Sequence, residues 1–201
     1  MIYLASRSPR RRELLAQIGV RFEPLLFRTG ARADPDTDET ALPGEPADEY
    51  VRRVTRMKAN AAWARVTQRR GLQRKPVLAA DTTVAVDDQI FGKPVDLADA
   101  RRMLAALSGR RHRVLTAVAL QQDHRFEIAL SESFVTFAPL GGERIEAYIA
   151  TGEALDKAGA YGIQGRAGAF VLRLEGSYTG VMGLPLYETA ELLRLFGVMA
   201  P

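Results

Sequence analysis

Serine and arginine side chains gather where the first predicted helix begins. The stretch at residues 6–12 reads SRSPRRR, and Ser8 followed by Pro9 is typical of an N-cap and the first helical residue. Arginines in the first turn oppose the positive end of the helix dipole, whereas a bound phosphate would reverse that cost. The sequence therefore predicts an anion site here, in preference to a solvated basic face. Its candidate ligands are Ser6, Ser8, the free backbone N–H groups of the first turn and the three arginines Arg10, Arg11 and Arg12.

The same electrostatic argument predicts how these arginines affect stability. Because Arg10 and Arg11 lie against the helix dipole, replacing either with alanine should leave stability equal or slightly higher. Anion binding should weaken in both variants, since each would lose a guanidinium that can donate to phosphate.

Two groups of carboxylates could ligate a metal ion or activate water. Asp81 follows the apolar run at 76–80, so we expect it at the end of a strand, where α/β sheets bind their ligands. A carboxylate there can hold a divalent cation or orient water, although a simple Asx turn is the alternative. Asp38 and Glu39 lie in a polar stretch at 28–46, where carboxylates either face solvent or complete a magnesium site with substrate phosphates.

Lysines are rare in this chain, only four of its 28 basic residues, and arginine cannot copy their compact point charge. Lys58 falls four residues after Val54 on the apolar face of a predicted helix, so it either snorkels to the surface or points into a polar cleft. Lys93 lies between Gly92 and Pro94, in a short rigid loop suited to aiming a charge. Both lysines are therefore candidates for binding an anion.

A glycine-rich polar block at 156–165 could bind a base. Its glycines at 159, 162 and 165 allow the backbone to approach a ligand closely. Gln164 presents an amide donor beside an acceptor, which is the edge needed to hydrogen-bond a base. The glycine spacing matches neither the Rossmann nor the P-loop pattern, so the block by itself indicates neither of those nucleotide folds.

Composition narrows the function classes. The 201 residues include no cysteine and two histidines, which excludes disulfides, a cysteine nucleophile and a histidine-built metal site. The apolar runs are shorter than the ~20 residues that span a bilayer, and the N-terminal basic cluster follows the apolar stretch, the reverse of a signal peptide. We therefore expect a cytoplasmic protein with no membrane partner. A net charge of +4 favours anionic partners.

Helices alternating with strands must position these side chains. Apolar alternation predicts the strands and helical spacing of apolar residues predicts the helices. The predicted strands lie at 2–5, 22–27, 76–80, 84–91 (a hairpin turning at 87–88), 111–121, 126–137 and 170–174. The predicted helices lie at 9–18, 48–70, 97–107, 143–150 and 186–196. With no repeat and no linker, this order indicates one α/β domain over residues 1–201 with a mixed sheet.

The order of these motifs resembles the Maf family of nucleoside triphosphate pyrophosphatases. The resemblance is carried by LASRSPRRRELL at 4–15, DET at 38–40, GEPADEYVRRVTRMKA at 44–59, AADTTV at 79–84, GKP at 92–94, SGRRHRVLTAV at 108–118, TGEALDKAGAYGIQG at 151–165 and GSYTGVMGLPL at 176–186. These blocks cover almost the whole chain in order. The resemblance implies an elongated, ITPase-like mixed β-sheet with flanking helices, two lobes around a central cleft, and pairing as a homodimer. The implied reaction converts a nucleoside triphosphate to the monophosphate and pyrophosphate with a divalent cation, Mg, Mn or Co.

The resemblance also implies roles for individual residues. Asp81 matches the catalytic carboxylate, and Glu39 together with Asp81 matches the metal ligands. The implied substrate-binding residues are Ser6, Arg10, Arg11, Lys58, Lys93, Thr82 and Gln164. Substrate specificity is assigned to Arg10, Thr82 and Gln164, which match the branch that acts on dTTP and UTP. Such an enzyme would also suit the removal of non-standard pyrimidine nucleotides.

Two other functions compete with this interpretation. A nucleotide- or nucleic-acid-binding regulator of septum formation would suit a basic chain, but aromatic residues make up 7% and do not interleave with the arginine clusters. We therefore expect no stable nucleic-acid partner. A purine-specific housecleaning hydrolase of similar architecture would lack Gln164 and the Ser-Pro-Arg-Arg start.

Overall fold

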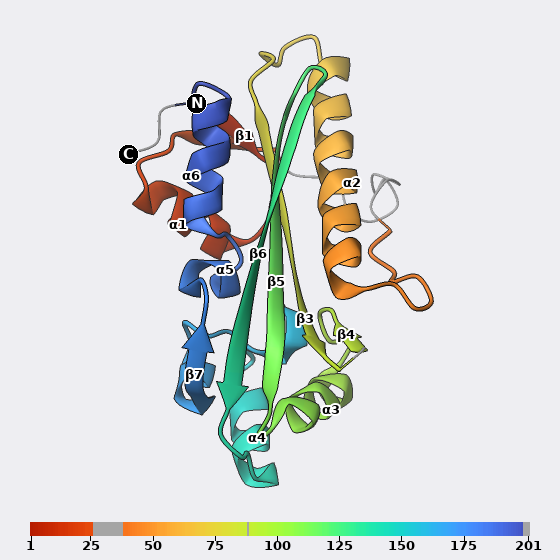
Figure 1. Cartoon of the computed structure of the whole chain (residues 1–201), viewed down its shortest axis with the longest axis vertical. Coiled ribbons are helices and arrows are strands. Elements are labelled where there is room, and N and C mark those ends of the chain that lie inside the picture. The colour runs from red at the N-terminus through yellow and green to blue at the C-terminus, as the bar shows by residue number, and fades with distance from the viewer. Residues whose placement is uncertain (26–37, 88, 199–201) are drawn as a thin grey trace.

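A mixed β-sheet runs the length of the molecule (Figure 1). The computed structural model describes residues 1–25, 38–87 and 89–198. The strands in these ranges are β1 Ile2–Leu4, β2 Phe22–Pro24, β3 Val77–Val86, β4 Gln89–Phe91, β5 Arg111–Gln122, β6 Arg125–Phe137 and β7 Val171–Glu175. Their order is β2-β1-β3-β5-β6-β7, with β4 beside β3, and only the β1–β2 and β1–β3 pairs of this described set are parallel. The predicted α/β fold with a mixed sheet is confirmed.

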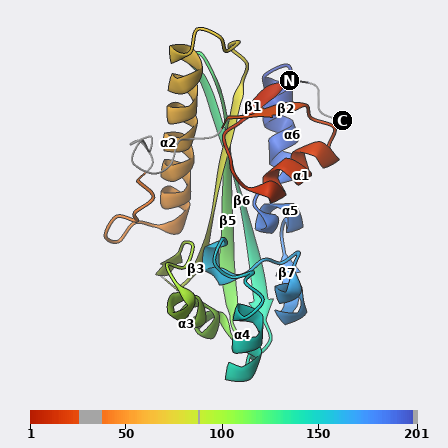
Figure 2. The ribbon, with the colours of Figure 1, turned by 180° about the vertical axis from the view of Figure 1, so that it is seen from behind.

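Helices cover both faces of one half of this sheet (Figures 1 and 2). The helices are α1 Pro9–Gln17, α2 Ala47–Gln68, α3 Leu97–Leu107, α4 Gly142–Ile149, α5 Tyr178–Met182 and α6 Leu186–Leu195, with short 3₁₀ turns η1 Ala158–Ala160 and η2 Arg166–Phe170. Side chains alternate along β3, so that Val77 and Ala79 pack under α2 whereas Leu78 and Ala80 pack under α1 and α6. No helix in the described ranges has the length and apolar character needed to cross a membrane.

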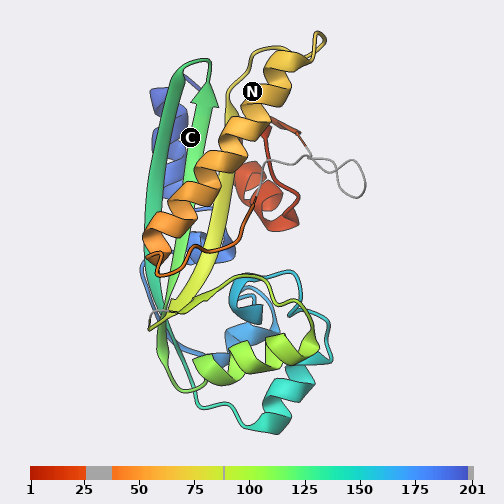
Figure 3. The same ribbon diagram turned by 90° about the vertical axis from the view of Figure 1, so that its right-hand side faces the viewer.

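The long strands β3, β5 and β6 connect this first lobe to a second one (Figure 3). The second lobe is formed by α3, α4, β4, β7 and the segment that carries η1 and η2. Its core packs Phe91, Leu104, Phe137, Ile145 and Phe170 around the far ends of the long strands. The expected elongated shape with two lobes is therefore confirmed.

The prediction that the strand before Asp81 stops there is wrong. β3 continues to Val86, because its antiparallel register with β5 is unbroken from Val77 to Ala85 and supplies the backbone hydrogen bonds on that side. On its other side, β1 pairs with the beginning of β3 and β4 pairs with its end. Residues 79–83 therefore have an open edge, and it is the carboxyl end of β1 that reaches the gap.

Local start and stop signals explain the elements next to this gap. Ser8 is the N-cap of α1 and Pro9 is its first residue, as predicted. The second strand ends at Pro24, earlier than predicted, and the polar stretch expected at 28–46 is described only from residue 38, its first part lying outside the described residues. α5 was not predicted, because five residues are too few to show a helical period; Ser177 caps it.

Candidate active site

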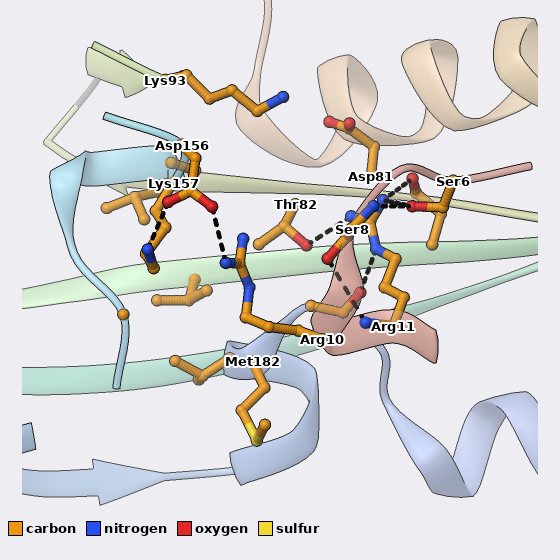
Figure 4. A pocket seen from close by; sticks show the side chains of 18 of the residues that line it. Ser6, Ser8, Arg10, Arg11, Asp81, Thr82, Lys93, Asp156, Lys157 and Met182 are labelled. Atoms are coloured by element: carbon orange, nitrogen blue, oxygen red, sulfur yellow. Dashed lines mark hydrogen bonds and ion pairs between the residues drawn. The ribbon is translucent and has the colours of Figure 1, made fainter. Parts of the chain in front are cut away.

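A cleft of about 540 Å³ lies where the two lobes meet, along the open edge of β3 (Figure 4). This volume is in the range of small-molecule sites. Its walls come from the β1–α1 turn, α2 and the stretch before it, β3, the loop after β4, the segment of η1, and the end of α5 with Gly183. All nine residues to which the family resemblance assigns a role line it: Ser6, Arg10, Arg11, Glu39, Lys58, Asp81, Thr82, Lys93 and Gln164. These segments come from distant parts of the sequence, so the cleft exists only in the folded chain.

Lys58 links two carboxylates at the α2 wall of the cleft. Its Nζ lies 2.6 Å from Asp81 Oδ1 and 2.8 Å from Glu39 Oε1. The side chains of Lys58 and Asp81 are 15% and 11% exposed, whereas that of Glu39 is 46% exposed. Of the two possibilities for Lys58, the structure thus selects the polar cleft. Asp38, the other carboxylate proposed from this stretch, is exposed and accepts from Thr40 N at 2.9 Å instead.

Glu39 is held in place by its backbone as well as by its charge. Tyr50, on the first turn of α2, donates from its hydroxyl to Glu39 O at 2.9 Å. Burial raises the pKa of the Glu39 carboxyl, but Lys58, with smaller effects from Lys93 and Arg11, outweighs burial and holds that pKa below its ordinary value. Burial, with further contributions from Asp81 and Glu39, raises the pKa of Tyr50 to about 12, so its phenol stays a donor.

Arg11 ties three segments together at the open edge of β3. Its guanidinium donates to Ala80 O at 2.7 Å and to Gly183 O at 2.7 Å, and more weakly to the hydroxyls of Ser6 and Thr82, each at 3.3 Å. Burial lowers the pKa of Arg11, and the carboxylate of Asp81 opposes that shift. Carbonyls that lack a strand partner are thereby satisfied by a charged donor.

The α1 start faces the cleft, as the anion-site prediction requires (Figure 4). Ser8 Oγ accepts from Arg11 N at 3.5 Å, and Ser8 N donates to Ser6 Oγ at 3.2 Å. Arg12 does not line the cleft; its guanidinium donates to Arg7 O at 3.1 Å on the surface. Of the three arginines in the first turn, the cleft therefore receives Arg10 and Arg11.

Arg10 contacts the second lobe across the cleft. Its Nη1 lies 3.1 Å from Asp156 Oδ2, and Asp156 also pairs with Lys157. Burial raises the pKa of the Asp156 carboxyl, but hydrogen bonds from Lys157 and Arg10 outweigh it and lower that pKa. Asp156 is 60% exposed, so this contact between the lobes is accessible to water. Neither Asp156 nor Tyr50 was identified from the sequence, because nothing in the local pattern pairs them with the cleft.

Threonine hydroxyls form a chain on the α5 side of β3. Thr82 Oγ1 lies 2.9 Å from Thr116 Oγ1, and Thr116 donates to Gly180 O at 2.7 Å. Thr116 lies opposite Thr82 in the β3–β5 register and is fully buried. Sequence reasoning missed it. The available signal is a single hydroxyl in the apolar run VLTAVAL of β5.

Lys93 and Gln164 line the cleft without a hydrogen-bond partner among the described residues, and Figure 4 shows Lys93 extending towards Asp81. Both side chains therefore stay available to a ligand. The neighbouring glycine has a different role from the one expected. A Cβ on Gly162 would come within 2.7 Å of Lys157 Cε, so this glycine makes room for a lysine of the protein itself.

The carboxylates of the cleft are too few for a metal centre built from protein alone. Within the described ranges, no group of three or more histidine, aspartate or glutamate side chains could hold a metal ion. Asp81 and Glu39 share Lys58 between them, which places two hard oxygen donors in one part of the cleft. This donor set fits a divalent cation such as magnesium if phosphate oxygens complete the shell and Lys58 gives up a carboxylate.

Known proteins resemble this chain along almost its whole length. A family model described as Maf-like protein matches residues 1–196. A dTTP/UTP pyrophosphatase of Aromatoleum aromaticum is 59% identical over 197 residues, covering 98% of this chain and 95% of that protein. One from Dechloromonas aromatica is 56% identical over 196 residues, covering 98% and 97%. Among solved structures, the Ham1 protein of Staphylococcus aureus has a TM-score of 0.43 and 15% identity, covering 68% of this chain and 71% of that one.

Proposed function

The chain belongs to the Maf family, and from this we propose that it is a nucleoside triphosphate pyrophosphatase that acts on dTTP and UTP. It hydrolyses the triphosphate to the monophosphate and pyrophosphate. One observation carries the proposal: Lys58 holds both Asp81 and Glu39 in a cleft that opens beside an arginine-bearing helix start. Such a cleft combines a carboxylate that can accept a proton with positive charge for a triphosphate.

The phosphates bind between the α1 start and two lysines, Lys93 and Lys58. Lys93 has no competing partner among the described residues, and Arg10 can exchange the exposed Asp156 carboxylate for a phosphate oxygen. Ser6 and the backbone N–H groups at the start of α1 add donors at the positive end of the helix dipole. Lys58 shifts from Asp81 and Glu39 to phosphate when the substrate and its cation arrive.

Asp81 is the base in the reaction that we propose. A water oxygen bonds to the α-phosphorus while Asp81 accepts the proton of that water, and the bond from the α-phosphorus to its bridging oxygen breaks. Pyrophosphate leaves with that electron pair. A divalent cation held by Asp81 and Glu39 would neutralise charge that develops on the phosphate oxygens. Lys58 and Lys93 contribute to the same neutralisation from the protein side.

Gln164 reads the base. Uracil and thymine present an acceptor at O4 beside the N3–H donor, and one side-chain amide can meet both. Cytosine reverses this order, so that rejection of CTP requires the amide to be held in one orientation. A site built around such hydrogen bonds can reject an analogue by ~10⁴-fold when buried polar groups are left unpaired. We therefore propose that dTTP and UTP are hydrolysed well, CTP poorly and purine triphosphates least.

The test is pyrophosphate release from dTTP, UTP, CTP, GTP and ATP, each with magnesium, manganese and cobalt. Rapid release from dTTP and UTP with at least one cation, and none after chelation, is the expected result. Equal rates with GTP or ATP would contradict the pyrimidine assignment, and binding of nucleotides without any turnover would favour a regulator instead.

Assembly and surroundings stay predictions. We propose a homodimer in the cytoplasm that has no stable nucleic-acid partner. Sedimentation equilibrium with and without UTP measures whether the protein is a dimer. The pyrophosphate assay with modified pyrimidine triphosphates tests whether the enzyme also removes non-standard nucleotides.

A further inference from the structure

The hydroxyl chain behind Thr82 has a direction that the geometry determines. Gly180 O is a carbonyl and can only accept, so the 2.7 Å contact uses the single hydrogen of the Thr116 hydroxyl. The 2.9 Å contact between Thr116 and Thr82 must then use the hydrogen of Thr82. Thr82 therefore donates away from the cleft, into the protein.

The remaining capacity of Thr82 Oγ1 is as an acceptor. One of its lone pairs faces Arg11 Nη2 at 3.3 Å, which can only donate and so reinforces the same direction. The other lone pair is left for the cleft, which Thr82 lines. Thr116 is fully buried and does not line the cleft. Its hydroxyl contacts the cleft residue Thr82 on one side and Gly180, the residue before the cleft residue Val181, on the other.

We propose that Thr116 is a positioning residue that fixes the Thr82 hydroxyl as an acceptor toward the substrate, so that this position selects a hydrogen-bond donor. The inference rests on the proposed function and extends it to a residue outside the cleft. The donor is a hydroxyl of the sugar, or the N3–H of the base shared with Gln164 in a three-centre hydrogen bond, which present the same chemistry at this position. An acceptor placed there, such as N3 of cytosine, meets a lone pair instead of a hydrogen and is rejected.

The experiment measures kcat/KM for UTP, CTP, dUTP and 3′-deoxy-UTP in the wild type and in Thr116→Val. Valine keeps the shape of threonine but removes the hydroxyl, which frees Thr82 to rotate and to donate into the cleft. We expect the ratio of kcat/KM for UTP to that for one of the other three nucleotides to fall about tenfold in Thr116→Val. A tenfold change corresponds to the free energy of one buried hydrogen bond. If the preference for UTP over CTP falls, the donor is the base N–H. If the preference for UTP over a deoxy analogue falls, the donor is a sugar hydroxyl.

Three further variants separate positioning from simple structural damage. Thr116→Ser keeps the hydroxyl and should retain the wild-type preference. Thr55→Val is the matched control, because Thr55 is also fully buried and donates to a β5 carbonyl, that of Ala117, on the opposite face of the sheet. It should lose stability without changing the preference. In Thr82→Val/Thr116→Val, the second substitution should add nothing to Thr82→Val, since residues that act through one another are not additive.

If Thr116→Val does not fold, Thr116→Ala removes the same hydroxyl and serves in its place. Unchanged preferences in a folded variant, or effects of Thr82 and Thr116 substitutions that simply add, would overturn the inference. A wild-type enzyme that releases no pyrophosphate from UTP would instead overturn the proposed function, so the two failures are distinct.

Discussion

The two faces of β3 at the cleft carry different kinds of side chain, although the residues that supply them are neighbours in sequence. Side chains alternate along a strand, so Asp81 faces α2 and its lysine while Thr82 faces α5 and the buried threonine. The α2 face carries charges that are partly open to water and paired with each other. The α5 face carries hydroxyls whose direction is set by the carbonyl of Gly180 and by the guanidinium of Arg11. Charges that are paired in this way can be redistributed when a charged substrate arrives, whereas the hydroxyl chain is fixed as soon as the chain folds.

Removing the carboxylate of the α2 face should produce the largest effect. Asp81→Asn keeps the shape of the side chain but cannot accept a proton, so we expect kcat to fall by about 10²- to 10⁴-fold. The urea midpoint should change little in comparison. Near-normal turnover in this variant would show that the base is another group, with Glu39 the first candidate, and would remove the chemical difference between the two faces.

Arg11 contacts the open edge of β3 beside Thr82, and its contacts change the expectation drawn from the helix dipole. Because its guanidinium satisfies the carbonyls of Ala80 and Gly183, Arg11→Ala leaves buried acceptors unpaired. We therefore expect a loss of about 2–4 kcal/mol in the free energy of unfolding, measured by urea denaturation. This is the opposite of a stability that stays equal or improves.

Arg10→Ala is the matched control for that measurement. Arg10 is next in the chain, and its one ion pair among the described residues is with the exposed Asp156. The free energy of unfolding of the Arg10→Ala variant should therefore stay within about 1 kcal/mol of the wild type. Its KM for UTP should rise, since phosphate loses a donor. Stability that stays equal or rises in both variants would mean that the helix dipole, and not the carbonyl contacts, decides the role of these arginines.

Glu39 tests whether the charged face does more than stabilise. Two Lys–Glu pairs in this chain have nearly the same geometry: Lys58–Glu39 in the cleft and Lys75–Glu23 on the surface, each at 2.8 Å with glutamates 46% exposed. Glu39→Gln should lower kcat about tenfold or more and raise the magnesium concentration needed for half-maximal rate. Glu23→Gln removes an equivalent ion pair and should leave kcat and the magnesium requirement unchanged. If Glu39→Gln and Glu23→Gln change kcat and the magnesium requirement equally, the role of Glu39 is structural.

Local signals in the sequence predict one part of this site and not the other. The Ser-Pro start of α1 is a property of adjacent residues, and the structure confirms it at Ser8. The path of β3 is not local: the polar run at Asp81 is typical of a strand end, but β5 pairs through it from residues 30 or more positions away. Burial of that polar run depends on the register between strands, which single-strand patterns do not contain.

The same reasoning explains which site residues were missed. Lysine is rare in this chain, which draws attention to its four lysines. The apolar helix face around Lys58 and the short rigid loop around Lys93 then select these two. Thr116 becomes notable only once the register places it opposite Thr82, and Tyr50 only once α2 brings it to Glu39. Residue types in the sequence therefore point to the charged α2 face of β3, whereas the hydroxyl chain on the α5 face is found only in the three-dimensional structure.

The smallest expected effect is the pH dependence that Glu39 gives to stability. Lys58 outweighs burial and lowers the pKa of folded Glu39 below its ordinary value of 4.5. Between these two pKa values the unfolded state binds more protons, so the stabilisation is complete above about pH 5 to 6 and is lost as the pH falls through the folded pKa. The amount is at most about 1 kcal/mol, because water screens a carboxylate that is 46% exposed. Urea midpoints of the wild type and Glu39→Gln, measured without metal from pH 7 to pH 3, should differ most at pH 7 and converge in acid. A difference that stays constant over this range would mean that the Lys58–Glu39 pair adds nothing to folding, and that the charged face is held together by Lys58 and Asp81 alone.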